Sequence, residues 1–149
     1  MTFQMYLVDT NVISAAAPSK VVPAADLVAW MDARSAQLFI STVTVAEIED
    51  GIAKALREKA RRKASGLTEW LETLLHLYGQ RILPFDLAAA RIAGVLSDLA
   101  RSRGTAPGFA DIVIAATARS HGLTLLTRHA RRFEPLGLST VNPFERLPP

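Results

Sequence analysis

The segment Tyr6-Leu7-Val8-Asp9-Thr10-Asn11 changes from apolar to polar at its midpoint. The apolar half, together with the residues back to Phe3, predicts a buried strand. The polar half consists of residue types that end strands and cap helices. We therefore expect a strand over residues 3–8 and a helix directly after it. In open parallel sheets the functional crevice lies beyond the carboxyl ends of the strands. Asp9 is at that end, which makes it the first candidate site residue.

The rest of the chain alternates between strand and helix patterns. Short apolar runs predict further strands over residues 38–41, 81–85, 123–127 and 138–141. Apolar residues at three- and four-residue intervals predict helices over residues 24–34, 43–57, 68–77, 87–102 and 109–121. We expect the second and third of these helices to form a hairpin that breaks near Ser65-Gly66. Alternating strands and helices imply an α/β fold with helices on both faces of a mostly parallel central sheet of four or five strands.

Length and composition predict one soluble domain over residues 1–149. The chain is 50% hydrophobic, which suffices for a core of ordinary size. It contains no cysteine, so any metal must be held by oxygen or histidine, and a reducing, cytoplasmic setting is expected. The N-terminus lacks the pattern of a signal peptide, and no apolar stretch reaches the roughly 20 residues of a membrane span. We expect a cytoplasmic protein without a membrane partner.

Basic residues outnumber acidic residues by 17 to 14, which gives a formal charge of +3. The sequence pI of about 9.7 is compatible with a polyanionic partner. Two basic clusters lie over residues 54–63 and 128–132. Each is either a solvated surface or a contact for phosphate groups, and the sequence leaves both interpretations open.

Two further carboxylates lie near the starts of helices in the predicted fold. Glu47 lies in the first turns of the helix after the second strand, and Asp111 lies in the first turn of the helix before the fourth. Each candidate also has a structural explanation: Asp9 as a helix cap, Thr44 to Glu47 as a capping box, and Asp111 as a complement to the helix dipole. All three have apolar neighbours, however, where an unpaired carboxylate is costly to bury. Such a cluster needs a counter-charge, and Mg²⁺ or Mn²⁺ suits ligands that are all oxygen.

Four blocks of sequence resemble the PIN-domain family, and specifically its VapC-type toxins. The blocks are Tyr6-Leu7-Val8-Asp9-Thr10-Asn11-Val12-Ile13-Ser14, Ser41-Thr42-Val43-Thr44-Val45-Ala46-Glu47, Asp111-Ile112-Val113-Ile114-Ala115-Ala116-Thr117-Ala118 and Leu125-Leu126-Thr127-Arg128. They occur in order and at the usual spacing, so the resemblance covers nearly the whole chain. It implies a three-layer PIN-like sandwich and a metal-dependent endoribonuclease, the toxin of a type II toxin-antitoxin pair. It also implies a small antitoxin partner and a homodimer, for which Phe3, Trp30 and Leu74 are speculative interface residues.

The resemblance assigns Asp9, Glu47 and Asp111 as the catalytic residues that bind Mg²⁺ or Mn²⁺. One position departs from the family pattern: Arg132 occupies the place where a fourth acid is common. This departure puts a second metal ion in doubt and leaves Glu134 or water as substitutes. An alternative is therefore a catalytically weakened PIN-fold module that only binds nucleic acid.

The expected mechanism is hydrolysis of an RNA phosphodiester by a water that the metal ion makes more acidic. Thr10, Asn11 and Thr127 are candidates for orienting water around the ligands, although such residues are often only caps or strand ends. Arg128 and Arg132 are candidates for RNA contact, with a surface ion pair as the alternative.

Two other kinds of activity use related residues. A phosphatase or phosphoacceptor domain also places an aspartate after its first strand, but the residues after Asp9 provide neither a second aspartate nor a lysine. Cleavage of DNA uses the same phosphate and metal chemistry as cleavage of RNA, so the residues do not separate the two. The preference for RNA comes from the resemblance.

Overall fold

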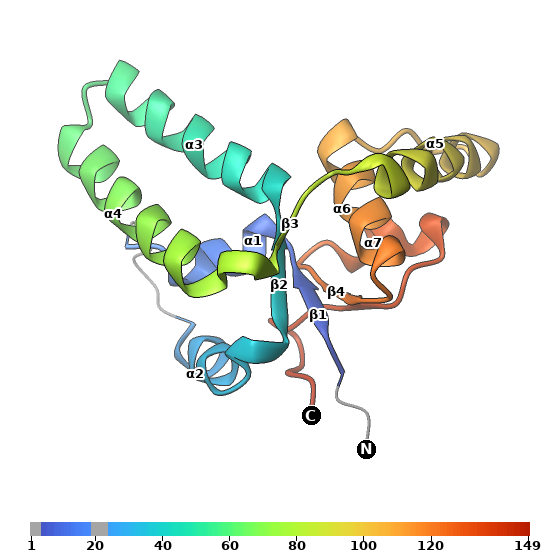
Figure 1. Cartoon of the computed structure of the whole chain (residues 1–149), viewed down its shortest axis with the longest axis horizontal. Coiled ribbons are helices and arrows are strands. Elements are labelled where there is room, and N and C mark those ends of the chain that lie inside the picture. Colours follow the sequence, from blue (N-terminus) through green and yellow to red (C-terminus); the bar gives the residue numbers. More distant parts are fainter. Residues whose placement is uncertain (1–3, 19–23) are drawn as a thin grey trace.

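A parallel sheet forms the centre of the protein in the computed structural model, which describes residues 4–18 and 24–149 (Figure 1). Its strand order is β3-β2-β1-β4-β5, and every neighbouring pair is parallel. The strands are β1 (Tyr6–Val8), β2 (Leu38–Ser41), β3 (Ile82–Leu83), β4 (Thr124–Leu126) and β5 (Thr140–Val141). The predicted α/β fold is confirmed, with five strands, although most strands are shorter than the apolar runs suggested.

Helices cover both faces of this sheet, as Figure 1 shows. One group consists of α1 (Thr10–Ile13), α2 (Ala25–Ala33), α3 (Thr42–Arg57) and α4 (Arg61–Tyr78). The other consists of α5 (Leu87–Ser102), α6 (Phe109–Ser120) and α7 (Ala130–Phe133). Short 3₁₀ turns cover Ser14–Ala16, Ser35–Gln37, Gly79–Arg81 and Glu134–Leu136. Within residues 4–18 and 24–149, no helix has both the length and the apolar character needed to cross a bilayer.

The strands divide the core into two halves because successive side chains point to opposite faces of a sheet. In β1, Tyr6 and Val8 belong to the cluster under α1 to α4, whereas Leu7 belongs to the cluster under α5 to α7. In β4, Leu126 lies in the first cluster and Leu125 in the second. Both faces of the central strands are therefore buried, which explains why their sequences are continuously apolar.

The predicted break of the long helical hairpin at Ser65-Gly66 is wrong. These residues lie inside α4, and the chain turns at residues 58–60 instead. Lys59 adopts a left-handed conformation with φ of 62°, and the N–H of Ala60 donates to the carbonyl of Ala55 at 2.8 Å. This is the hydrogen-bond pattern of a Schellman cap, which usually has glycine at the left-handed position. A lysine there gives no sequence signal, so the prediction followed Gly66.

The suggested interface residues Trp30 and Leu74 are core residues, so that suggestion is wrong for both. They are only 7% and 6% exposed, and both belong to the core half under α1 to α4. The ring of Trp30 packs edge-on against Tyr6, and its indole N–H donates to the carbonyl of Pro148 at 2.9 Å. Phe3 lies outside the described residues. The homodimer itself stays a prediction.

Candidate active site

Asp9 directly follows β1, the central strand, where the order in which strands join the sheet reverses. The chain proceeds from β1 to β2 on one side, whereas β4 and β5 are added on the other side. The backbone N–H of Asp9 continues the β1–β4 pairing by donating to the carbonyl of Leu126 at 2.9 Å. The N–H of Thr127 donates in the same way to Val141 at 3.0 Å. Asp9 and Thr127 are thus side by side at the carboxyl ends of adjacent strands, where parallel α/β sheets bind ligands.

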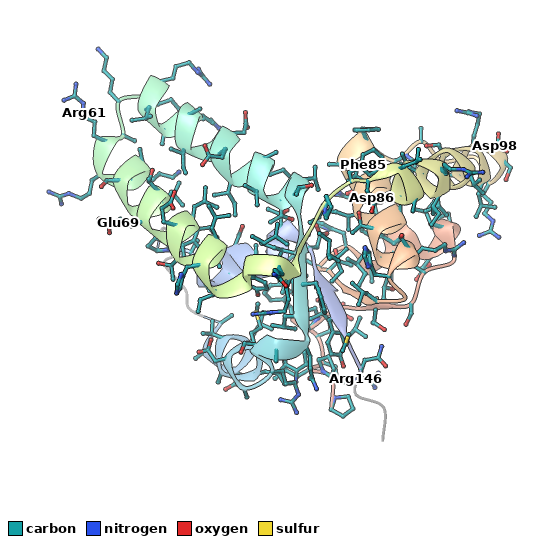
Figure 2. All side chains as sticks on the ribbon, in the orientation of Figure 1. Arg61, Glu69, Phe85, Asp86, Asp98 and Arg146 are labelled. Carbon is teal, nitrogen blue, oxygen red and sulfur yellow. The ribbon has the colours of Figure 1, made fainter. Side chains whose placement is uncertain are left out.

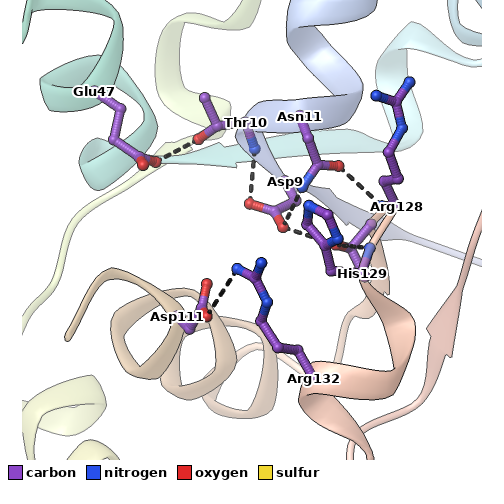
Figure 3. A network of polar contacts seen from close by, with 9 residues as sticks. Asp9, Thr10, Asn11, Glu47, Asp111, Arg128, His129 and Arg132 are labelled. Carbon is purple, nitrogen blue, oxygen red and sulfur yellow. Dashed lines mark hydrogen bonds and ion pairs between the residues drawn. The ribbon is translucent and has the colours of Figure 1, made fainter. Parts of the chain in front are cut away.

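The carboxylate of Asp9 is held by hydrogen bonds to both of its oxygens (Figure 3). Oδ1 accepts from the backbone N–H of Thr10 at 2.8 Å, which also makes Asp9 the N-cap of α1. Oδ2 accepts from Asn11 Nδ2 at 3.0 Å and from Thr127 Oγ1 at 2.8 Å. Thr10, Asn11 and Thr127 therefore all contact the carboxylate of a proposed metal ligand. Their action on water is a prediction that these contacts do not test.

Asp9 is only 5% exposed, and this burial raises the pKa of its carboxyl above the ordinary value of 3.8. The hydrogen bonds from Thr127, Thr10 and Asn11 lower the pKa, but they do not cancel the effect of burial. The negative charge of Asp111 raises the pKa further. The site therefore concentrates negative charge in a poorly hydrated place, an arrangement that a cation would stabilise.

Glu47 reaches the same region from α3 but lies in different surroundings. Its side chain is exposed, so its apolar sequence neighbours do not bury the Glu47 carboxylate, and the argument from costly burial does not hold for this residue. Thr10 Oγ1 donates to Glu47 Oε1 at 2.6 Å and also lies 2.9 Å from Thr44 Oγ1. The capping-box explanation is wrong too, because Ser41 caps α3 and Thr44 lies within the helix. Thr10 thus connects Glu47 to the loop that carries Asp9.

Asp111 lies in the first turn of α6, three residues after the N-cap Gly108. Its Oδ2 is 3.4 Å from Nη1 of Arg132, which belongs to α7. The predicted alternative of an ion pair for Arg132 is therefore observed. Figure 3 shows Arg132 reaching between Asp111 and the Asp9 loop, while Glu47 faces them from α3. A surface pocket of about 390 Å³ borders Asp111, with Arg131 and Arg132 among its other lining residues.

A second set of contacts fastens the loop after β4, and the sequence interpretation missed its key residue, Asn142. The N–H of Arg128 donates to Asn11 Oδ1 at 2.9 Å, and Asn142 Nδ2 donates to the carbonyl of Arg128 at 3.2 Å. The guanidinium of Arg128 lies 4.0 Å from the ring centre of Phe144. Asn142 directly follows β5, so the rule that identified Asp9 by its place after a strand could have identified Asn142 too.

The donor atoms fit a hard divalent cation, with water completing its ligand shell. Carboxylate oxygen is the preferred donor for Mg²⁺ and Mn²⁺, and Mg²⁺ commonly takes one or two carboxylates while keeping several waters. Asp9 and Asp111 supply two carboxylates that interact electrostatically. Within the described ranges, no three His, Asp or Glu residues gather closely enough to form a complete protein cage. The carboxylates of Asp9 and Asp111 are therefore of the kind that could hold such a cation together with water.

Three curated relatives match almost the whole chain. A plasmid stability protein, StbB, from Pseudomonas syringae pv. tomato is 41% identical, and the match covers 95% of this chain and 99% of StbB. A VapC ribonuclease, Y4jK, from Sinorhizobium fredii is 41% identical with the same coverage of 95% and 99%. Toxin FitB from Neisseria gonorrhoeae is 39% identical and covers 94% of this chain and 99% of FitB.

Solved structures confirm the fold. A chain in the crystal structure of FitAcB from Neisseria gonorrhoeae superposes with a TM-score of 0.82 at 39% identity, covering 94% of this chain and 99% of that chain. Residues 6–134 match the PIN domain family, and this range includes every acidic residue of the candidate site. The four blocks of sequence, the parallel sheet and the matches over nearly the full length agree, and the chain belongs to the PIN domain family.

Proposed function

We propose that this protein is a cytoplasmic endoribonuclease that requires Mg²⁺ or Mn²⁺ and acts as the toxin of a toxin-antitoxin pair. The observation that carries the proposal is the carboxylate of Asp9, which is buried, oriented by hydrogen bonds and close enough to Asp111 for their charges to interact. Neighbouring carboxylates repel each other, and burial makes the charge of Asp9 costly. Their position at the ligand-binding end of the sheet supports a role in binding a cation.

Each residue of the site has a distinct task in this proposal. Asp9 and Asp111 would hold the cation, and Glu47, which is exposed and turned toward them, would accept a proton from the attacking water. When bound, the cation neutralises charge on the scissile phosphate and makes a water more acidic. Thr10, Asn11 and Thr127 fix the orientation of the Asp9 carboxylate, so little reorganisation is needed during the reaction.

The choice of RNA and of a toxin rests on the relatives. Y4jK is named a VapC ribonuclease, and FitB is named a toxin, each at about 40% identity over almost the full chain. A protein of this kind needs a partner that restrains it, so we propose a small antitoxin protein as its binding partner. Basic residues beside the site, including Arg128, Arg131 and Arg132, suit a polyanionic substrate.

The decisive experiment is cleavage of a mixed RNA panel by the purified protein with Mg²⁺, Mn²⁺ or EDTA. Asp9→Asn and Asp111→Asn variants, each checked for its fold by circular dichroism, serve as matched controls because they remove charge and preserve shape. We expect cleavage that requires the metal and is lost in both variants. Equal activity in EDTA, or equal activity of wild type and variants, would reject the metal-dependent mechanism. An inert wild type that binds RNA, once a bound antitoxin is excluded, would favour the binding-module alternative.

The toxin assignment has a separate test in cells. Induced expression of the wild-type chain should arrest bacterial growth, whereas Asp9→Asn produced at the same level should not. Growth that continues with an active nuclease present would contradict the toxin role and leave the nuclease intact.

A further inference from the structure

Arg132 holds one of the two aspartates of the site in an ion pair. Its Nη1 lies 3.4 Å from Asp111 Oδ2, and the two side chains are 55% and 18% exposed. The only other ion pair among the described residues, Arg101 with Asp98, is fully on the surface of α5. Among the described residues, Arg132 is therefore the only basic side chain that forms an ion pair with an acid of the site.

The position of Arg132 combines a fixed backbone with a movable end. The next residue, Phe133, is fully buried in the core half under α5 to α7, which anchors α7. The guanidinium, by contrast, is more than half exposed, and it makes a single contact with Asp111 at 3.4 Å rather than a bidentate pair. Exposed ion pairs of this geometry are weak, so the guanidinium can leave Asp111 at small cost.

A divalent cation and this guanidinium compete for the same negative charge. Asp9 and Asp111 repel each other, and Arg132 supplies one positive charge to the pair. A divalent cation supplies two, and it repels a guanidinium a few ångströms away. Binding of the cation to Asp111 therefore favours the departure of Arg132.

Two neighbouring hollows show where the guanidinium can go. Arg132 lines the pocket of about 390 Å³ beside Asp111 and also a second pocket of about 420 Å³. The second pocket is bordered by Arg128, His129 and Arg131 on one side, with Glu134 and Glu145 as its acidic residues. Guanidinium groups bind phosphate oxygens in bidentate fashion, and basic surroundings attract a polyanion. A phosphate of a bound RNA would meet Arg132 there.

We propose that the guanidinium of Arg132 has two positions. It neutralises Asp111 in the metal-free protein, and it moves to an RNA phosphate when the cation binds. The inference rests on the proposed function, because it requires a cation at Asp9 and Asp111 and an RNA substrate. It predicts opposite changes in two affinities when the guanidinium is removed: binding of the cation becomes stronger, and binding of RNA becomes weaker. A purely structural role would weaken both.

The test is calorimetric titration of the full chain with Mg²⁺ at low ionic strength, for wild type, Arg132→Gln and Arg131→Gln. Arg131 is the matched control because it lines both pockets and makes no ion pair with a described residue. We expect Arg132→Gln to bind Mg²⁺ about threefold more tightly, within the range of an exposed ion pair, and Arg131→Gln to change much less. High salt should reduce the difference.

The second readout is the KM for a short single-stranded RNA at saturating Mg²⁺, which should rise about threefold in Arg132→Gln and less in Arg132→Lys, which keeps the charge. Equal or weaker Mg²⁺ binding by Arg132→Gln overturns the inference even if cleavage is confirmed, and so does an unchanged KM. If neither wild type nor Arg132→Gln binds Mg²⁺ or, in a parallel titration, Mn²⁺, the proposed function fails together with the inference.

Discussion

Asp9 and Glu47 lie at the same end of the sheet, but they differ in burial and in the number of hydrogen bonds that they accept. Asp9 is buried, and both of its carboxylate oxygens accept hydrogen bonds from neighbours fixed by β1 and β4. Glu47 is exposed on α3 and accepts one side-chain hydrogen bond, from Thr10. One acid is positioned by the sheet, and the other stands exposed on a helix face with one side-chain hydrogen bond.

This difference in burial means that the two carboxylates depend on a bound ligand to different degrees. Burial raises the pKa of Asp9 and makes its charge expensive, so that charge is best stabilised by a ligand. An exposed carboxylate is already hydrated and loses less when no ligand is present. We therefore expect the function to depend more strongly on Asp9 and its neighbours than on Glu47 and its neighbour.

The largest effect should separate the two acids directly. Asp9→Asn should lower RNA cleavage by more than about 100-fold, because loss of a ligand exceeds the 10- to 100-fold typical for loss of a supporting contact. Glu47→Gln should cost less, because Glu47 is exposed and contacts the Asp9 loop only through Thr10. Initial rates at saturating Mg²⁺ measure both. A larger loss for Glu47→Gln would reverse the comparison and make Glu47 the central catalytic group.

The next effect concerns the support of Asp9. Thr127→Val keeps the shape of a fully buried side chain but removes the hydrogen bond to Asp9 Oδ2. We expect Mg²⁺ affinity to fall by about 10-fold or more, and the pKa of Asp9 to rise further, because that hydrogen bond lowers it. Calorimetry and carbon-detected NMR titration provide the measurements. Thr127→Ser, which retains the hydroxyl, should stay near wild type; a defect as large as that of Thr127→Val would point to packing instead.

Acidification should affect the site earlier than it affects an ordinary aspartate. The folded-state pKa of Asp9 lies above 3.8, and protons compete with a cation for the ionised form. The apparent Mg²⁺ affinity should thus reach its full value above the raised pKa and should fall about 10-fold for each pH unit below it. The raised pKa also means that the contribution of Asp9 to the free energy of unfolding decreases as pH rises from 3.8 through that pKa. Mg²⁺ titrations at several pH values check the prediction, and a loss that begins only below 3.8 would contradict it.

The smallest effect should come from the connection between the two acids. Thr10→Val removes the hydroxyl that bonds Glu47 and Thr44 but keeps the backbone N–H that bonds Asp9. We expect a loss of cleavage of no more than about 10-fold, since the hydrogen bond to Glu47 is solvent-exposed. Thr10→Ser is the matched control. If Thr10→Val is as damaging as Thr127→Val, the support of Glu47 is as important as the support of Asp9.

The sequence predicted the strands and the order of the main helices, but it erred where local signals compete with tertiary packing. Gly66 resembles a helix break, yet it lies within α4, and Pro18 Cγ comes within 3.8 Å of the place where a side chain would begin. Lys59 makes the actual turn with a backbone conformation that favours glycine. Trp30 and Leu74 were suggested as interface residues because apolar periodicity does not say what covers a helix face.

The sequence by itself determined that Asp9 ends a buried strand, because an apolar run followed by Asp-Thr-Asn has few other structural solutions. It also excluded thiolate ligands from the site, because the chain has no cysteine. Only the tertiary structure decided that Thr127, 118 positions away, bonds Asp9, that Glu47 is exposed and that Arg132 pairs with Asp111. These contacts depend on strand order and on how α3, α6 and α7 pack on the sheet, and such long-range geometry is not encoded in the spacing of residues along one segment.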